Sequence, residues 1–175
     1  MPQVNKLRFR IMVLGFLLGA LTFWMSSNGH ATQAPAIVSP IWLNSQPLQF
    51  EDLRGKVVMV EFWTFGCWNC RNIEPYVKEW HEKYAKEGLV VIAVHSPEFQ
   101  YEYDVEKVKD YISEHKIPYA VPIDNDFFNW RRYRNRYWPT LYLIDKRGEI
   151  HYTKIGEGGY KETERTIQRL LDEPA

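Results

Sequence analysis

Cysteine is scarce in this sequence, which has only Cys67 and Cys70 among its 175 residues. A structural disulfide framework uses several pairs to close long loops, whereas a bridge between these two would close almost nothing. The sequence also lacks an excess of one charge, because Lys plus Arg and Asp plus Glu both number 22. The whole chain therefore gives no electrostatic reason to expect a nucleic acid or an anionic membrane surface as a partner.

No apolar run reaches the ~20 residues that a bilayer-spanning helix needs. The longest run, residues 11–25, follows three basic residues that are the only charges in the first 50 positions. This pattern predicts a signal peptide or, if uncleaved, a membrane anchor within residues 1–36, and a buried core helix is the remaining interpretation. Either of the first two places the rest of the chain outside the cytoplasm, and we expect a periplasmic protein that touches the membrane only through this segment.

The rest of the composition fits one globular domain. Apolar residues make up 45% of the chain and aromatic residues 15%, which is enough to bury one sizeable core. Residues 26–40 are small, polar and aperiodic, so we expect a linker there, a domain over 37–175 and order from Ile41 onward. Removing residues 1–36 takes away three basic and no acidic residues, which leaves a mildly acidic domain.

Hydrophobic periodicity predicts an α/β fold. Residues 57–63 are almost continuously apolar and rich in β-formers, as in a central strand buried on both faces. Residues 69–86 carry apolar side chains at helical spacing, with Gly88 as a stop. The other expected elements are a short hairpin of residues 41–43 with 47–50, strands at 89–94 and 119–123, a helix at 105–115, an antiparallel hairpin of 140–144 with 150–155, and a final helix at 160–171. This order predicts a mixed sheet with helices on both faces.

The two cysteines lie where the predicted central strand runs through a short turn into the following helix. At a helix N-terminus, unpaired N–H groups and the helix dipole stabilise a thiolate and lower the pKa of the first cysteine. Cys67 is therefore expected to be the attacking nucleophile. Cys70 lies about one helical turn further on and is expected to resolve the mixed disulfide that Cys67 forms with a substrate.

Other uses of such a pair fit less well. Attachment of a haem needs a histidine directly after the second cysteine, and Arg71 stands there. A tetrahedral zinc site needs two further ligands, but there is no third cysteine, and the histidines show no paired ligand spacing. A metal clip and an inert structural bridge stay open as alternatives to redox chemistry. We expect no metal and no cofactor.

Several separated motifs resemble thioredoxin-like proteins. Residues 57–70 resemble the active-site strand and turn of that family, including its buried acid, here Glu61. Pro75 matches the proline of the active-site helix, and residues 138–140 (Trp-Pro-Thr) resemble the cis-proline turn. Residues 140–158 resemble the last two strands of the family's sheet.

Within that superfamily the chain is most similar to the exported TlpA-like branch. The segments VHSPEF (94–99) and NRYWP (135–139) resemble the DipZ-type redox domain, and the likeness covers about residues 41–171. The membrane part and the additional C-terminal domain of DipZ-type proteins have no counterpart here, and the dipeptide between the cysteines is Trp-Asn. These departures leave the electron source and the redox direction open.

The resemblance implies a thioredoxin-like fold with an N-terminal β-hairpin extension and an extra βα-type insertion between the active-site helix and the cis-proline turn. It implies a thiol-disulfide oxidoreductase that exchanges the Cys67–Cys70 dithiol with protein substrates. A reductase fed by a membrane thiol-disulfide relay is favoured, and the reduction of apocytochrome c or of another oxidised partner would be a typical task.

Five further residues are candidates for the site. Burial of Glu61 should raise its pKa, so that this carboxyl could take the proton of Cys70, unless the strand points it to a wet edge. Pro139 is expected in cis, where nearby backbone could pair with an extended substrate. Trp68, Trp138 and Thr140 are expected beside that groove as substrate-binding residues, with simple packing as the alternative for the tryptophans.

Two weaker candidates lie near these motifs. His95 ends a predicted strand on the side where open α/β sheets place functional loops, although a hydrogen-bonded structural histidine is more common. The arginines at 131, 132, 134 and 136 form a basic patch that could depress a thiolate pKa, and a solvated surface is the simpler explanation.

Three rival functions stay open. The same dithiol could act as an oxidase that donates its disulfide, which would require a less reducing potential. Two thiolates could instead deliver a soft ion such as Cu(I). A peptide-binding module with an inert bridge is the third, and peroxide chemistry is disfavoured because no separate peroxidatic cysteine is evident.

Overall fold

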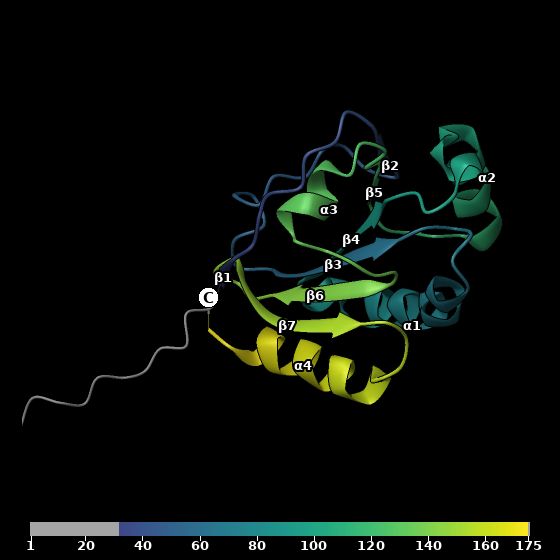
Figure 1. The fold of residues 1–175 in the computed structure, drawn as a ribbon. Coiled ribbons are helices and arrows are strands. Elements are labelled where there is room, and N and C mark those ends of the chain that lie inside the picture. Colours follow the sequence, from purple (N-terminus) through teal and green to yellow (C-terminus); the bar gives the residue numbers. More distant parts are fainter. Residues whose placement is uncertain (1–31, 175) are drawn as a thin grey trace, which may run out of the picture. The chain divides into compact units, whose positions relative to one another are not determined.

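The computed structural model describes residues 32–174, so the predicted targeting segment lies almost entirely outside the described residues. These residues form a five-stranded mixed sheet in the order β1-β7-β6-β3-β4 (Figure 1). Its central strand, β3 (Val57–Trp63), is buried at all seven positions, as the apolar run predicts. It pairs in parallel with β4 (Leu89–His95) and antiparallel with β6 (Thr140–Ile144).

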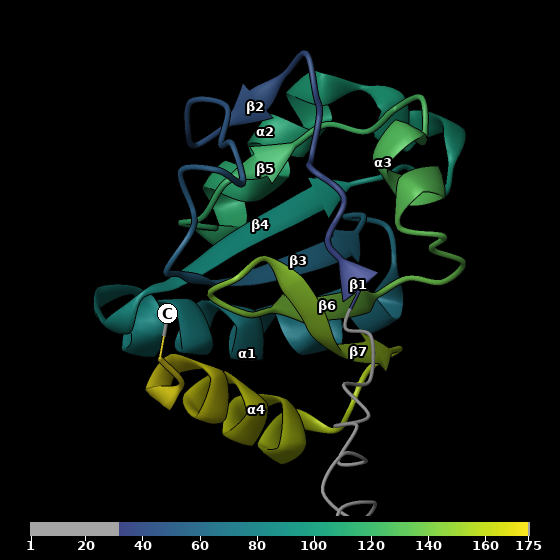
Figure 2. The same cartoon turned by 90° about the vertical axis from the view of Figure 1, so that its left-hand side faces the viewer.

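Helices cover both faces of this sheet, as expected (Figure 2). Helices α1 (Trp68–Tyr84) and α4 (Tyr160–Asp172) lie on one face, over the β3 side chains of Val57, Met59 and Trp63. The short α3 (Phe128–Arg132) and the N-terminal segment cover the other face, where Phe62 is buried. Helix α2 (Val105–His115) lies beyond the β4 edge and adds Val108 and Ile112 to the core of α1.

The remaining elements complete the sheet edges. Strand β7 (Glu149–Ile155) forms the predicted hairpin with β6, with an irregularity between Leu143 and Ile144. Between α1 and the turn at Pro139 the chain forms two 3-10 helices, η1 (Ala85–Glu87) and η2 (Gln100–Tyr103), together with β4, α2, β5 (Val121–Pro122) and α3. Isolated parallel bridges tie Ala120 and Ile123, which flank β5, to β4.

The predicted N-terminal hairpin is wrong. Strand β2 (Trp42–Leu43) pairs antiparallel with β5 rather than with residues 47–50. Residues 47–50 lead into a turn, in which Asp52 and Leu53 donate backbone N–H groups to Gln49 and Phe50. The side chains of Leu48 and Phe50 pack on the sheet, so burial of these two apolar groups decides the path of the segment.

The predicted linker is also wrong over residues 32–40. Strand β1 (Thr32–Gln33) pairs with β7, and Ala34 and Ile37 are buried against the sheet. Arg132 donates to the carbonyl oxygen of Ala36. Residues 32–40 follow the surface of the domain as an extended segment, called the strap below. Such a segment can form without a periodic pattern of hydrophobic residues.

Asn129 holds this strap to α3, a helix that the sequence analysis missed. Its side-chain oxygen accepts the N–H of Val38 at 2.9 Å, and its Nδ2 donates to the Val38 carbonyl at 2.7 Å. The buried carboxylate of Asp124 accepts the backbone N–H groups of Asn129 and Trp130, which satisfies the first donors of the short helix. This cap stabilises the helix. Five residues are too few to show a hydrophobic periodicity, which is why the sequence did not predict the helix.

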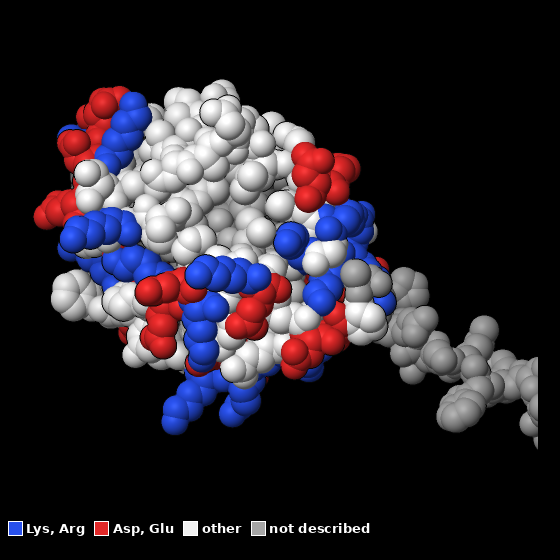
Figure 3. All heavy atoms as spheres, turned by 180° about the vertical axis from the view of Figure 1, so that it is seen from behind, with Lys and Arg blue, Asp and Glu red and all other residues white. Residues whose placement is uncertain are grey.

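The surface carries charges of both signs. Seen from behind (Figure 3), basic and acidic side chains are mixed along the lower part of the molecule and at its left and right edges, and a broad area in the upper centre carries neither. No single-signed field forms on this face. Within residues 32–174, no helix combines the length and the apolar character that crossing a bilayer requires.

Replacing Asn129 with alanine should destabilise the domain by about 2–3 kcal/mol, because the substitution leaves both backbone groups of Val38 without their partners. Urea unfolding followed by circular dichroism measures the change, with an unchanged m-value as the sign of intact two-state behaviour. Asn72→Ala is the matched control, since its exposed side chain bonds to the exposed Glu157, and it should cost less than about 0.5 kcal/mol. Equal effects of the two variants would contradict this account of the strap.

Candidate active site

The cysteines lie where β3 gives way to α1. After Trp63 the chain turns through Thr64 to Gly66, and Cys67 caps the N-terminus of α1. The Sγ of Cys67 accepts the backbone N–H of Cys70 at 3.3 Å. Both cysteines are free thiols and buried, so the structure represents the reduced dithiol. A sulfur in the N-cap position takes the place that serine or aspartate oxygens usually occupy.

The two thiols have opposite acidity. The hydrogen bond from the Cys70 thiol lowers the pKa of Cys67, and the backbone N–H groups of Cys70 and Asn69 act in the same direction against the opposing effects of burial and of Glu98. Burial raises the pKa of Cys70 strongly, and its interaction with Cys67 adds to the effect. The geometry therefore favours the thiolate of Cys67 over that of Cys70.

Glu61 lies in the same layer as the dithiol. Strand alternation directs Val57, Met59, Glu61 and Trp63 toward α1, and Glu61 is only 3% exposed. Burial, followed by the charges of Glu74 and Cys67, raises its pKa to about 8. The alternative of a wet strand edge is wrong. This carboxyl can change charge near neutral pH beside the thiol pair.

A buried carboxylate that the sequence analysis missed supports the active-site turn. Glu102 is fully buried in η2, and its Oε1 accepts the N–H of Gly66 at 2.7 Å. Its Oε2 accepts the N–H groups of Glu98 and Phe99 at 2.6 and 2.8 Å. A Cβ at position 66 would collide with Glu102 Oε1 and the Tyr101 hydroxyl, so any larger residue there would displace this buried carboxylate from its partners. The sequence offered one clue, a lone acid between the tyrosines of an aromatic segment.

His95 lies behind the turn, but its acidity argues for a structural role. Its Nε2 lies 3.2 Å from the hydroxyl oxygen of Thr64, and its ring stacks on Phe65 with centroids 5.7 Å apart. Burial lowers the pKa of His95 to about 3, which keeps the imidazole neutral at physiological pH. The residue thus reaches the neighbourhood of the cysteines and supports the turn without carrying a charge there.

The peptide bond between Trp138 and Pro139 is cis, as predicted. The Trp138 indole donates to the Ser96 carbonyl at 2.9 Å and packs on Trp130 with ring centroids 4.2 Å apart. Its ring is therefore committed largely to packing. Thr140 is buried and donates to the Tyr137 carbonyl, so its side chain supports the turn and offers no surface for direct substrate contact.

Exposed aromatic side chains surround the site. Trp68, directly after the nucleophile, is 71% exposed. In η2 and just before it, Tyr101 and Phe99 stack almost in parallel, and Tyr101 also packs against Phe65 of the turn. Of the predicted basic patch, Arg131 and Arg132 donate to backbone carbonyls, and none of its four arginines is among the groups that shift the pKa of Cys67. The patch therefore fits a solvated surface.

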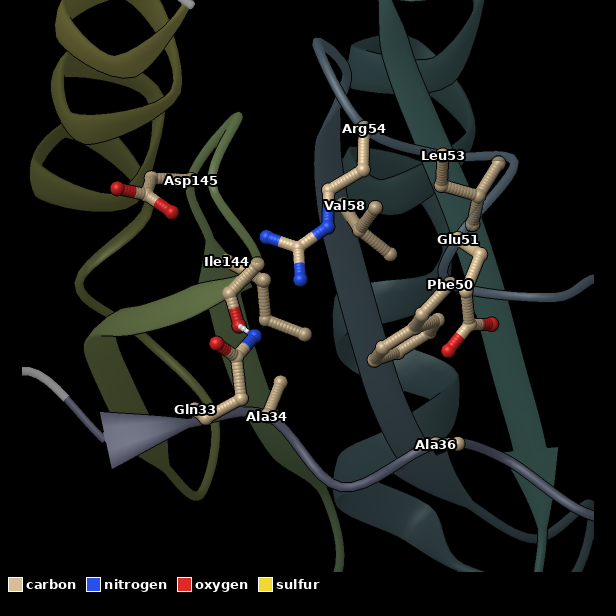
Figure 4. Close-up of a pocket in the computed structure, with 11 residues that line it drawn as sticks. Gln33, Ala34, Ala36, Phe50, Glu51, Leu53, Arg54, Val58, Ile144 and Asp145 are labelled. Carbon is tan, nitrogen blue, oxygen red and sulfur yellow. Dashed lines mark hydrogen bonds between the residues drawn. The ribbon is translucent and has the colours of Figure 1, made fainter.

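A pocket of about 160 Å³ lies at the opposite end of β3 from the cysteines (Figure 4). It is lined by Phe50, Arg54, Val58 and Asp145, among others, and it contains no thiol.

Asp145 also approaches Glu149 and His151 closely enough for the three to share a metal ion. Arg147 already pairs with both carboxylates, and backbone N–H groups of residues 147 and 149 occupy Asp145. Neither feature is part of the dithiol site.

Comparison with known proteins gives a consistent assignment. The chain matches the AhpC/TSA family over residues 31–153. It is 41% identical over 152 residues to protein DipZ of Mycobacterium tuberculosis. The matched region covers 85% of this chain and 22% of DipZ. The chain thus spans only about a fifth of the length of that relative.

A shorter relative is covered almost completely. Thiol-disulfide oxidoreductase YkuV of Bacillus subtilis is 31% identical over 132 residues, covering 75% of this chain and 88% of YkuV. The crystal structure of the thioredoxin-like superfamily protein SPOA0173 superposes with a TM-score of 0.77 at 25% identity, covering 83% of this chain and 99% of that one. With its dithiol at the N-terminus of α1, the chain therefore belongs to the AhpC/TSA family, has a thioredoxin-like fold and is a homologue of thiol-disulfide oxidoreductases such as YkuV.

Proposed function

We propose that this protein reduces disulfides of partner proteins outside the cytoplasm and receives its electrons from a membrane-bound thiol-disulfide relay. The observation that carries the proposal is the opposite acidity of the two thiols, with a nucleophilic Cys67 at the helix start and a protonated Cys70 beneath it. The basic and apolar N-terminal pattern supports export, as a released or an anchored protein. Maturation of cytochrome c is a task of this kind.

In the first step, the Cys67 thiolate attacks one sulfur of the substrate disulfide. A Cys67–substrate disulfide forms, and the other substrate sulfur leaves as a thiolate that takes a proton from solvent. In the second step, Cys70 loses its proton to the Glu61 carboxylate and attacks Cys67 Sγ, which releases the second substrate thiolate. Two electrons have then moved to the substrate, and the protein holds a Cys67–Cys70 disulfide that the donor dithiol reduces again.

Glu61 is suited to the second step by its environment. In the reduced protein the charge of Cys67 contributes to the raised pKa of Glu61, so only about a tenth of the carboxyl is ionised at pH 7. Once Cys67 is bound in the mixed disulfide it carries no charge, and this contribution disappears. Glu61 therefore ionises more readily at the step in which a base is needed.

The surroundings of Cys67 suit a protein substrate. The exposed Trp68 ring offers apolar contact area beside the nucleophile. Within the described residues, the backbone N–H and carbonyl of Trp138 form no hydrogen bond, whereas the Pro139 carbonyl accepts the N–H of Gly156. The Trp138 peptide groups are thus available to pair with an extended substrate segment. Disulfide donation is the alternative direction, since the same residues catalyse both.

The reduction potential decides the direction. Equilibration of the purified protein in dithiothreitol or glutathione buffers, followed by alkylation of free thiols, should give a value well below about −200 mV, as expected for a reductase. A value near about −120 mV, typical of a strong oxidant, would make the protein a disulfide donor. Stable Cu(I) binding without disulfide turnover would instead favour metal delivery.

Cys70→Ser should accumulate mixed disulfides with substrates, because the variant can attack but cannot resolve. Non-reducing electrophoresis of protein isolated from its own host, with mass spectrometry of the trapped partners, measures this effect. Cys67→Ser is the matched control and should trap nothing. Equal trapping by both variants, or full activity of Cys67→Ser, would rule out Cys67 as the nucleophile.

Glu61→Gln should slow resolution of the mixed disulfide by about 10²-fold at neutral pH, since it removes the base without changing the side-chain size. The same variant should be the more stable protein at high pH. The folded-state pKa is raised from 4.5 to about 8, so the stability of the unmodified protein falls relative to the variant between those values, by at most about 5 kcal/mol. Urea unfolding at pH 4, 6 and 9 measures the difference. A difference independent of pH would contradict burial of an ionisable Glu61.

A further inference from the structure

A second acid lies in the layer between β3 and α1. Glu74 follows Cys70 by one helical turn, and both residues are buried. Side chains four positions apart on a helix have Cβ atoms ~5–6 Å from each other. Glu61 points into this layer from β3, because its neighbours Met59 and Trp63 pack in the same core as Cys70. Two carboxyls and two thiols thus share one layer.

Three side chains hold the Glu74 carboxylate in place. Lys78 Nζ lies 2.8 Å from its Oε1, and His115 Nδ1 lies 3.1 Å from the same oxygen. The Tyr111 hydroxyl donates to its Oε2 at 2.8 Å. Lys78 also donates to the His115 carbonyl at 2.9 Å, which closes the network between α1 and α2. Both oxygens of Glu74 are therefore occupied, and the position of its charge is fixed.

Glu74 and Glu61 differ in the hydrogen bonds that their carboxyl groups accept, and therefore in their acidity. Burial acts to raise the pKa of Glu74, but the bonds from Lys78, Tyr111 and His115 outweigh it and hold the pKa below its ordinary value. No hydrogen bond to Glu61 is found within residues 32–174, and its pKa is raised to about 8. At neutral pH, Glu74 is thus ionised while Glu61 mostly keeps its proton. Neighbouring acids whose acidities are pushed apart are typical of acid-base sites.

Few other charges act on Glu61. On the adjacent strands its partners are Ala93 and Leu141, which carry none. Tyr119 and Tyr111 are near enough to interact with these acids, but burial raises the pKa of both phenols and keeps them neutral. The fixed charge of Glu74 and the changing charge of Cys67 are therefore the principal charges that act on Glu61.

We propose that Glu74 is a positioning residue for the dithiol reaction, whose anchored negative charge adds to the effect of burial in keeping Glu61 protonated in the resting protein and thereby shifts the pH range in which Glu61 exchanges a proton with Cys70. The inference rests on the proposed role of Glu61. Lys78 opposes this effect, because its ammonium partly neutralises Glu74. Removal of the Glu74 charge should therefore shift the titration midpoint of Glu61 to lower pH, and removal of the Lys78 charge should shift it to higher pH.

The test is the ¹³C-carboxyl NMR titration of Glu61 in the full reduced chain, together with the pH dependence of mixed-disulfide resolution. Glu74→Gln should move both midpoints to lower pH by about 0.5 unit or more, and Lys78→Gln should move them to higher pH. Glu79→Gln, on the exposed side of α1, is the matched control and should shift them by less than about 0.2 unit. A purely structural role of the network would not reverse sign between the two variants.

Two results would overturn the inference. If Glu74→Gln and Lys78→Gln leave the Glu61 midpoint unchanged while Glu61→Gln still slows resolution, Glu74 has no such role and the proposed function stands. If Glu74→Gln shifts the rate profile equally in a Glu61→Gln background, Glu74 does not act through Glu61. Failure of Glu61→Gln to alter the profile at all would contradict the proposed proton transfer itself. Lys78 is partly exposed, so Lys78→Gln should fold and still report the shift of the Glu61 midpoint even if Glu74→Gln fails to fold.

Discussion

The start of α1 at the end of the central strand is the constraint on which the rest of the site depends. A helix N-terminus leaves backbone N–H groups without intrahelical partners, and Cys67 Sγ accepts one of them. The same helical geometry places Cys70 on the buried side of the first turn, where a charge is costly. A single structural junction thus lowers the pKa of one thiol and raises the pKa of the other, and this difference separates the attacking thiol from the resolving one.

The junction is supported by buried acids that divide into two kinds. Glu102 and Asp124 accept backbone N–H groups and hold the active-site turn and α3 in place. Among residues 32–174 Glu61 has no such donor, and burial raises its pKa to about 8. Burial raises the pKa of Asp124 as well, but the N–H groups of Asn129 and Trp130 oppose this effect, whereas no such donor opposes the burial of Glu61 among the described residues. The protein therefore uses the same functional group as a fixed acceptor in one layer and as a titrating group in another.

Much of the fold could be read from local patterns. The strands at 57–63 and 140–144 and the helix at 105–115 have the predicted bounds, and α1, β7 and α4 agree to within a residue or two. These elements are long and buried on one or both faces, so their hydrophobic period is clear. The errors fall on residues 32–50 and on α3, where two-residue strands and a five-residue helix are held by long-range bonds such as those between Val38 and Asn129. No local pattern encodes a partner 91 positions away.

For the site, the sequence by itself determined the chemistry and the order of the two thiols. The spacing of Cys67 and Cys70, the strand before them and the helix after them are local features, and the acid at position 61 falls on a strand whose burial its own neighbours predict. Only the tertiary structure decided which other groups surround the dithiol. Glu102 comes to Gly66 from 36 positions away, and Tyr111 and His115 come to Glu74 from a different helix. Hydrogen bonds between distant side chains depend on packing of the elements that carry them, and packing is a property of the whole chain.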